Sequence, residues 1–342
     1  MRTIFWNEGV AIIDQTKLPE KLEVVVCKKV EELVEAIRRL AIRGAPALEA
    51  AGGYGVALAT VEREFKSLEE LKKHVEKAAE MIISARPTAV NLSVGVKRVL
   101  KVALKGESIE EVRSLAIKEA EKIADEDVRR NRKIGEFGAE LLEDGDTVLT
   151  YCNTGRFATV DWGTALGVVR SAIKKGKNIK VIACETRPLN QGSRLTCYEL
   201  IEDKIDVTLI TDAMVGIVMK RGLVDKVLVG ADRIVKDGVF NKIGTYTLSI
   251  VAKEHKIPFY VAAPTTTFDW DKTSEEVVIE ERPKEELIYC GTKLLAPPKV
   301  KVFNPAFDCT PLSYVNAIIT ELGIIRPPYE SNVPKLLGLK SF

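Results

Sequence analysis

The run Gly230-Ala231-Asp232-Arg233 combines residue types that are typical of a small-molecule site, and Asn241 and Lys242 follow it closely. It comes directly after Lys226–Val229, a short, β-branched apolar run that predicts a buried strand. Asp232 is therefore expected at the carboxyl end of a strand, where open α/β sheets bind ligands. Asn241 and Lys242 would lie in the loop that precedes a helix, whose N-terminus suits an anion. Taken alone, the run is equally typical of an ordinary surface turn.

Cys152 is a candidate reactive thiolate, because it follows a second predicted strand, 147–150. A cysteine at a strand end, next to Gly155 and a following helix, could have a lowered pKa and react as a thiolate. The alternative is an inert buried thiol, which is common for free cysteine. Its polar neighbours Asn153 and Thr154 weaken that alternative here.

Three further runs contain candidate binding residues. Gln191 follows the run Glu185–Pro188 and could hydrogen-bond a sugar hydroxyl. Arg43 and Arg86 suit a phosphate group, whose oxygens accept charge-assisted bonds worth ~1.5–3 kcal/mol each. Gly44 would allow the backbone to approach a ligand closely. Each run alone is weak evidence, because arginine in such loops is more often structural.

The elements that carry these residues fall into two domains. Residues 1–125 predict a mainly helical domain, since apolar residues recur there at helical spacing after a small β element. The expected strands are Thr3–Trp6, Val10–Asp14 and Leu22–Cys27, and the expected helices are Val30 to about Arg43, Ala47–Thr60, Leu68–Ser84, Ser93–Leu104 and a long one from Ile109 to Leu142.

Residues 126–342 alternate between strand and helix, which predicts a Rossmann-like domain with a parallel sheet. The fold class is therefore α/β. The expected strands are Thr147–Thr150, Lys180–Ala183, Val207–Ile210, Val227–Val229, Phe259–Ala262 and Val300–Phe303, and the expected helices are Thr164–Lys174, Ser193–Glu202, Ala213–Arg221 and Ile243–Lys256.

The composition excludes several classes of protein. The formal charge is +2 over 342 residues, so no general field attracts nucleic acid or membrane lipid. The amino-terminal residues lack the long apolar core of a signal peptide, and no apolar run could span a bilayer. Six scattered cysteines indicate reduced thiols in a cytoplasmic protein. No dinucleotide, Walker A or zincin motif is present, and no metal or redox cofactor is expected.

Taken together and in order, these runs resemble one family, the 5-methylthioribose-1-phosphate isomerases. That family shares a superfamily with the regulatory subunits of translation initiation factor 2B. The resemblance extends from Asp14 to Tyr329, nearly the whole chain. It is carried by Ile42-Arg43-Gly44-Ala45-Pro46-Ala47, Ala85-Arg86-Pro87-Thr88-Ala89-Val90-Asn91-Leu92, Tyr151-Cys152-Asn153, Glu185-Thr186-Arg187-Pro188, Gln191-Gly192, Gly230-Ala231-Asp232-Arg233 and Asn241-Lys242-Ile243-Gly244-Thr245-Tyr246.

The resemblance implies that Cys152 and Asp232 are the catalytic pair. The substrate contacts that it implies all retain the family residue type: Arg43, Gly44, Ala45, Arg86, Gln191, Asn241 and Lys242. The chain departs from the family pattern where Arg156 and Phe157 follow the Cys-Asn run, and where Glu49 follows Arg-Gly-Ala-Pro-Ala. Those departures bear on the identity of the substrate more than on the chemistry.

The implied reaction converts 5-methylthioribose 1-phosphate to 5-methylthioribulose 1-phosphate in methionine salvage. The phosphate on C1 locks the sugar ring, so an acid must help the ring oxygen leave before hydrogen moves from C2 to C1. Asp232, kept protonated by apolar surroundings, would be that acid. Cys152 would act either as a base at C2 or as a stabiliser of a hydride shift. The sequence does not separate these two routes.

Two alternatives stay open. A ribose-1,5-bisphosphate isomerase would need positive charge in place of the methylthio contact, which Arg156 could supply. We expect Arg156 instead to turn to solvent or to pair with Glu49 or Asp161, the usual state of arginine. A non-catalytic initiation-factor-2B-like subunit, which would bind initiation factor 2 or nucleotides, has no need of the pair Cys152 and Asp232. The resemblance also implies a homodimer that acts on a small sugar phosphate.

Overall fold

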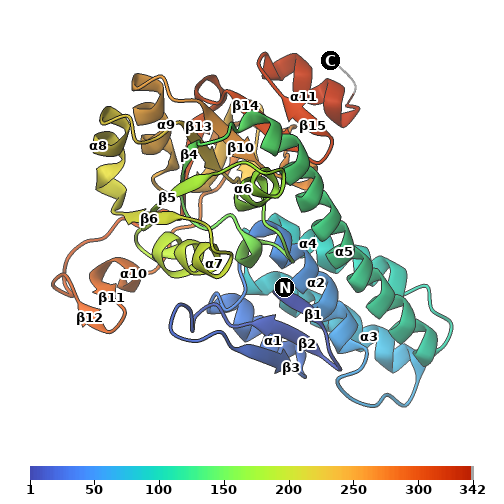
Figure 1. The fold of residues 1–342 in the computed structure, drawn as a ribbon. Coiled ribbons are helices and arrows are strands. Elements are labelled where there is room, and N and C mark those ends of the chain that lie inside the picture. Colours follow the sequence, from blue (N-terminus) through green and yellow to red (C-terminus); the bar gives the residue numbers. More distant parts are fainter. Residues whose placement is uncertain (340–342) are drawn as a thin grey trace. The chain divides into compact units, whose positions relative to one another are not determined.

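The computed structural model describes residues 1–339, which form two compact units (Figure 1). The first unit comprises residues 1–132 and 155–166, and the second comprises residues 133–154 and the chain from Gly167 onward. The boundary that we expected between the two domains, after residue 125, stays a prediction. No helix within residues 1–339 is both long and apolar enough to cross a membrane.

The first unit is mainly helical and includes a small antiparallel sheet, as predicted. The sheet has the order β1-β2-β3. Its strands are β1 (Ile4–Trp6), β2 (Val10–Ile13) and β3 (Val24–Cys27), and the helices are α1 (Val30–Arg38), α2 (Ala45–Ala59), α3 (Leu68–Ala85), α4 (Val90–Ala103) and the first part of α5 (Ile109–Gly138). The short 3₁₀ turn η2 (Arg156–Ala158) also belongs to this unit.

Helix α2 is buried on every side from Pro46 to Ala59, because its small residues let neighbouring helices approach closely. A Cβ atom on Gly52 would lie 2.4 Å from the carbonyl oxygen of Leu92 in α4. A Cβ atom on Gly95 of α4 would lie 1.9 Å from the carbonyl oxygen of Glu49. The two helices therefore cross with their backbones in contact, which fixes the position of the amino end of α2.

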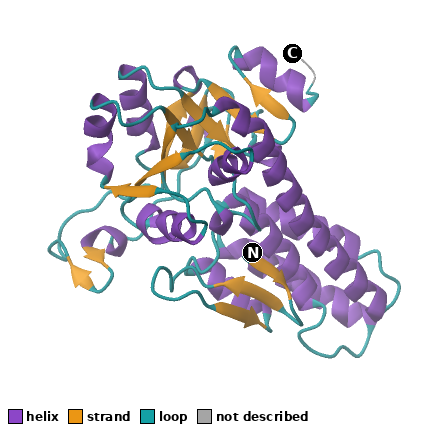
Figure 2. Cartoon of the chain, in the orientation of Figure 1, coloured by secondary structure: helices purple, strands orange, loops and turns teal. Residues whose placement is uncertain are grey.

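The second unit is built around a seven-stranded sheet of order β15-β14-β10-β7-β4-β5-β6, whose strands are orange in Figure 2. Every neighbouring pair is parallel except β14 and β15. This sheet confirms the predicted Rossmann-like fold. The strands are β4 (Thr147–Thr150), β5 (Lys180–Cys184), β6 (Val207–Ile210), β7 (Lys226–Val229), β10 (Phe259–Ala262), β14 (Ala317–Thr320) and β15 (Gly323–Ile325).

Helices cover both faces of this sheet (Figure 1). Helices α8 (Val215–Lys220) and α9 (Thr245–Glu254) pack against each other and share a core with alternate residues of β4 and β7, such as Leu149 and Val227. The end of α5 and helix α6 (Ala165–Lys174) lie on the other face, where Gly138 contacts Val168 of α6 and Ile319 of β14. Helix α7 (Cys197–Glu202) follows the π-helical turn η3 (Gly192–Thr196), and α11 (Tyr329–Leu337) packs against β15.

The strand predicted over Val300–Phe303 is wrong. These residues form no strand, and Phe303 is 77% exposed, because charged residues and the preceding prolines leave the run without a buried partner. The sheet is completed instead by β14, a fully buried apolar run.

Two smaller sheets that we did not predict also belong to this unit. A three-stranded sheet of order β13-β9-β8 joins β8 (Arg233–Ile234), β9 (Gly238–Lys242) and β13 (Phe307–Pro311). Strands β11 (Tyr289–Cys290) and β12 (Lys293–Leu294) form a hairpin after the short helix α10 (Glu285–Ile288).

Candidate active site

The two predicted catalytic residues follow neighbouring strands at the centre of the large sheet. From β4 the chain moves outward through β5 and β6, and then returns to the other side of β4 to form β7. The border between β4 and β7 is therefore a topological switch point, where parallel sheets leave a crevice at the strands' carboxyl ends. Cys152 comes just after β4 and Asp232 just after β7. The fold thus brings these two side chains to the same edge of the sheet.

Cys152 is buried and has a backbone conformation that is unusual for its residue type. Its φ of 64° lies in the left-handed region, which costs a residue other than glycine about 1–3 kcal/mol. Hydrogen bonds on both sides maintain this conformation. The Cys152 N–H donates to Thr186 Oγ1 over 2.8 Å, and Thr196 Oγ1 donates to the Cys152 carbonyl oxygen over 2.8 Å. Such local strain, held by the surrounding structure, is characteristic of functional sites.

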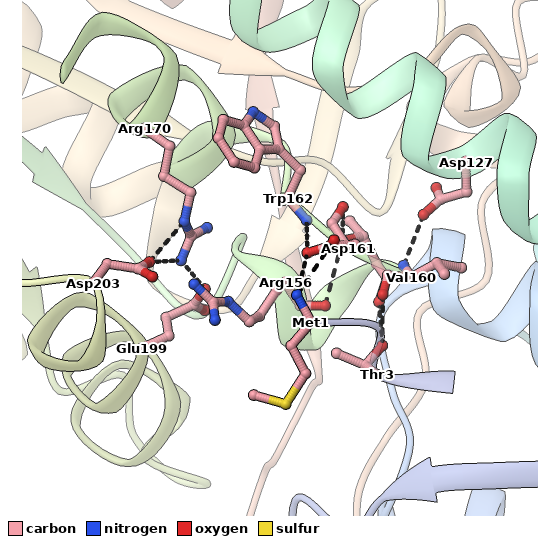
Figure 3. A network of polar contacts seen from close by, with 11 residues as sticks. Met1, Thr3, Asp127, Arg156, Val160, Asp161, Trp162, Arg170, Glu199 and Asp203 are labelled. Atoms are coloured by element: carbon pink, nitrogen blue, oxygen red, sulfur yellow. Dashed lines mark hydrogen bonds and ion pairs between the residues drawn. The ribbon is translucent and has the colours of Figure 1, made fainter. Parts of the chain in front are cut away.

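Asn153 anchors the Cys-Asn run to a buried ionic cluster. Its side-chain amide donates to Thr196 Oγ1 over 3.1 Å and to Glu199 Oε1 over 2.5 Å. Figure 3 shows Arg170 joined to both Glu199 and Asp203 by dashed lines. Arg170 Nη2 lies 2.5 Å from a carboxylate oxygen of each, so the charge of Glu199 is compensated within the core. Asn153 therefore has a structural role beside the catalytic candidate.

Asp232 is half-buried in the short connection between β7 and β8. Its amide donates to the carbonyl oxygen of Phe240 in β9 over 2.8 Å, and the next residue, Arg233, pairs with Phe240 in the small sheet. The backbone of Asp232 is thereby tied to β9, the strand that carries Asn241 and Lys242.

Asn241 and Lys242 lie at the end of strand β9, so the prediction of a loop in front of a helix is wrong for them. Pairing with β13 imposes the strand, since Asn241 lies opposite Asp308 and Lys242 opposite Phe307. Both residues are buried. The Asn241 amide donates to Thr245 Oγ1 over 3.0 Å, and Lys242 Nζ donates to the carbonyl oxygen of Ala306 over 2.9 Å.

We expected the N-terminus of helix α9 to suit an anionic ligand. In the structure it binds a carboxylate of the protein itself. Asp308 accepts the N–H groups of Gly244 over 2.7 Å and of Tyr246 over 3.1 Å. Burial raises the pKa of Asp308 to about 6, while these hydrogen bonds oppose that shift. The positive end of the helix dipole is therefore already partly neutralised.

Gln191 is the candidate binding residue nearest the carboxyl end of β5. It directly precedes the π-helical turn η3 and is 5% exposed. Its Oε1 atom is buried and accepts no hydrogen bond from the described part of the chain. A buried carbonyl oxygen without a donor is costly, which favours a hydroxyl-bearing ligand as its partner.

The candidate phosphate-binding residues belong to the first unit, around the amino end of α2 and the carboxyl end of α3. Arg43 is half-buried and precedes Gly44, the residue before α2. Arg86 directly follows α3 and is also half-buried. Ala45 begins α2, where the first N–H groups of a helix have no intrahelical partner and suit an anion.

The glycine at position 44 is required by the protein's own backbone. Gly44 has φ 92°, and a Cβ atom there would lie 2.3 Å from the carbonyl oxygen of Ala158. We predicted that Gly44 lets a ligand approach the backbone closely. In the structure, the turn η2 makes such a close approach to Gly44. Direct ligand contact by Gly44 stays a prediction.

Three residues that connect these runs were not predicted from the sequence: Tyr151, Thr186 and Asp212. Asp212 follows β6, and its two carboxylate oxygens accept the N–H groups of Thr186 and Arg187 over 2.8 and 2.7 Å. Burial, followed by the neighbouring Asp212 carboxylate, raises the pKa of Tyr151. Thr186 lies inside the run Glu185–Pro188, which could have pointed to a functional role for it. Nothing in the sequence indicates such a role for Asp212.

Comparison with known proteins gives a consistent result. The chain matches the initiation factor 2 subunit family over residues 41–327. A protein of Archaeoglobus fulgidus, provisionally named as a methylthioribose-1-phosphate isomerase, is 72% identical over 337 residues, which cover 98% of this chain and 99% of the relative.

Two crystal structures share the fold over nearly the full length. The 5-methylthioribose 1-phosphate isomerase of Pyrococcus horikoshii OT3 has a TM-score of 0.93 at 43% identity, covering 98% of this chain and 96% of that one. A structure from A. fulgidus, described as subunit delta of translation initiation factor eIF-2B, has a TM-score of 0.93 at 71% identity, covering 99% and 100%. The predicted resemblance is confirmed, and the chain belongs to the initiation factor 2 subunit family, alongside relatives named methylthioribose-1-phosphate isomerase.

Proposed function

We propose that this chain is a cytoplasmic sugar-phosphate isomerase, which converts 5-methylthioribose 1-phosphate to 5-methylthioribulose 1-phosphate in methionine salvage. The observation that carries the proposal is the placement of Cys152 and Asp232 after the two strands that flank the switch point of the sheet. The names of relatives at up to 72% identity support the same activity.

In the proposed mechanism, the residues of the chain divide into binding and proton-transfer roles. Arg43, Arg86 and the backbone at Gly44 and Ala45 hold the phosphate. Gln191, Asn241 and Lys242 bind the sugar oxygens. Holding a reactant in this way removes much of the entropic part of the barrier.

Asp232 donates a proton to the ring oxygen as the bond from C1 to that oxygen breaks. In the enolate route, the Cys152 thiolate removes the proton from C2 and returns it to C1. In the hydride route, hydrogen moves directly from C2 to C1, and Cys152 stabilises the transition state. In either route the C2 hydroxyl gives its proton to the Asp232 carboxylate as the C2 carbonyl forms. Both routes end with the same ketose phosphate.

The decisive experiment compares kcat/KM for 5-methylthioribose 1-phosphate and ribose 1,5-bisphosphate, in the parent protein and in Arg156→Ala. Arg156 begins η2 and is half-buried. We expect a preference for the methylthio sugar that Arg156→Ala leaves unchanged. A preference for the bisphosphate that collapses on losing Arg156 would instead establish the bisphosphate isomerase.

A non-catalytic role in translation initiation is the second candidate, because the A. fulgidus structure at 71% identity is described as an initiation factor subunit. Such a subunit would turn over neither sugar phosphate. Activity of the purified parent protein with either substrate therefore decides between a catalyst and a purely structural subunit.

A further inference from the structure

Thr186 holds the backbone of Cys152 at its N–H group. It is fully buried, and its Oγ1 atom accepts the Cys152 N–H over 2.8 Å while donating to the carbonyl oxygen of Cys184 over 3.1 Å. The hydroxyl thus links the chain after β4 to the end of β5. Thr186 has φ 65°, which is a genuine outlier for a β-branched residue. Two adjacent strand ends therefore carry left-handed residues that contact each other.

Asp212 holds Thr186 in that conformation from a third strand end. Its carboxylate accepts both the Thr186 N–H and the Arg187 N–H, so the backbone around Thr186 is clamped on one side. The Asp212 carboxylate also faces Tyr151, one residue before Cys152, and helps to raise the pKa of its hydroxyl after the larger effect of burial. The ends of β4, β5 and β6 are thereby joined by side-chain contacts that converge on Cys152.

We propose that Thr186, held by Asp212, is a positioning residue that aims the Cys152 thiol at the substrate. The direction of a side chain depends on the backbone conformation of its residue, and Cys152 would relax toward negative φ without the Thr186 contact. That relaxation would turn its Cβ atom and move the sulfur atom. This inference rests on the proposed isomerase, in which the position of Cys152 relative to C2 determines the rate.

The test uses Thr186→Val, which removes the hydroxyl but keeps the shape, and Thr186→Ser, which restores the hydroxyl. We expect Thr186→Val to lower kcat by about 10–100-fold, the effect of misplacing a reacting group by about 1 Å, with KM unchanged within about twofold. We expect Thr186→Ser to recover most of kcat. Thr320→Val is the matched control, because Thr320 is equally buried. Its hydroxyl likewise donates to a carbonyl oxygen, that of Gly323 over 2.9 Å, and accepts a backbone N–H, that of Leu322 over 3.2 Å.

A second measurement does not depend on isomerase activity. The rate at which iodoacetamide alkylates Cys152, followed by peptide mass spectrometry, reports the exposure and state of the thiol. We expect at least a fivefold change in that rate in Thr186→Val, and parent-like rates in Thr186→Ser and Thr320→Val. If the parent protein isomerises neither sugar but the alkylation rate still changes, the proposed function fails and the positioning role survives.

Parent-like kcat and alkylation in Thr186→Val would overturn the inference. If Thr186→Val does not give folded protein, the variant Asp212→Asn is tested in its place. Asparagine keeps one of the two acceptor oxygens, and residue 212 is only half-buried. We then expect a change of at least about twofold in the alkylation rate of Cys152, and a parent-like rate would count against the proposal.

Discussion

At the scale of single residues, Cys152 and Asp232 follow adjacent strands. Asp232 is the proposed acid, and Cys152 is the proposed base or transition-state stabiliser. We predict that Cys152→Ser and Asp232→Asn each lower kcat by about 10²–10⁴-fold, the usual cost of losing an acid or base. The KM and the midpoint of thermal unfolding should remain close to those of the parent. Near-normal turnover in either variant would remove that residue from the mechanism.

Asp127 is a buried carboxyl group in the first unit. Its Oδ2 atom accepts the Val160 N–H over 2.7 Å, as Figure 3 shows. Burial is the main reason that the pKa of Asp127 is raised from an ordinary 3.8 to about 7. The Val160 N–H and Arg130 of α5 oppose this shift, whereas Glu49 of α2 contributes to it. The native protein therefore binds more protons than the unfolded chain between about pH 4 and 7. Stability should fall as the pH rises through that window.

We predict that Asp127→Asn removes this pH dependence, because asparagine still accepts the Val160 N–H but does not ionise. The variant should be more stable than the parent at pH 8, by about 4 kcal/mol given about 1.4 kcal/mol per pKa unit, and similar to it at pH 4. Thermal unfolding at several pH values measures the difference, with exposed Asp271→Asn as the control. A variant less stable than the parent at pH 8 would contradict the assigned direction.

At the scale of elements, the start of helix α9 depends on Gly244. This residue has φ 104°, and a Cβ atom there would lie 2.1 Å from the hydroxyl oxygen of Tyr151. We predict that Gly244→Ala destabilises the protein by at least ~1–3 kcal/mol from backbone strain alone. It should also displace Tyr151 and so reduce kcat.

Gly216→Ala is the control for that substitution. Gly216 lies inside helix α8, and its Cβ atom would meet nothing within 4 Å. Helix propensity then favours alanine by about 1 kcal/mol, so this variant should unfold at a slightly higher temperature. Equal unfolding temperatures for both variants would show that the contact with Tyr151 is unimportant.

At the scale of the whole molecule, we propose a homodimer with contacts through the second unit. Apolar side chains are exposed on helices α8 and α9, which pack against each other, with Ile217 at 46% and Ile250 at 41%. We predict a dimer in sedimentation velocity at micromolar concentration, and a monomer for Ile217→Glu. Val278→Glu, at an exposed site outside these helices, should leave the dimer intact. A monomeric parent protein would rule the proposal out.

Local sequence patterns predicted most of the elements, because apolar periodicity and glycine or proline breaks act within a few residues. The helical first unit, the strands β4, β5, β6, β7 and β10, and the strand-end positions of Cys152 and Asp232 all follow from such patterns. The family resemblance, confirmed by comparison, predicted the candidate residues. Their individual roles stay predictions.

Only the tertiary structure decided the rest, since it depends on partners that are distant in the sequence. Asn241 and Lys242 lie in a strand because β13, more than sixty residues later, pairs with them. Asp308 reaches the start of α9 through the same pairing. Asp212 has no distinguishing sequence context, and its role emerges only where the parallel strands β4, β5 and β6 end side by side. A hydrogen-bond network that spans three strand ends is a property of the sheet order, which no local pattern encodes.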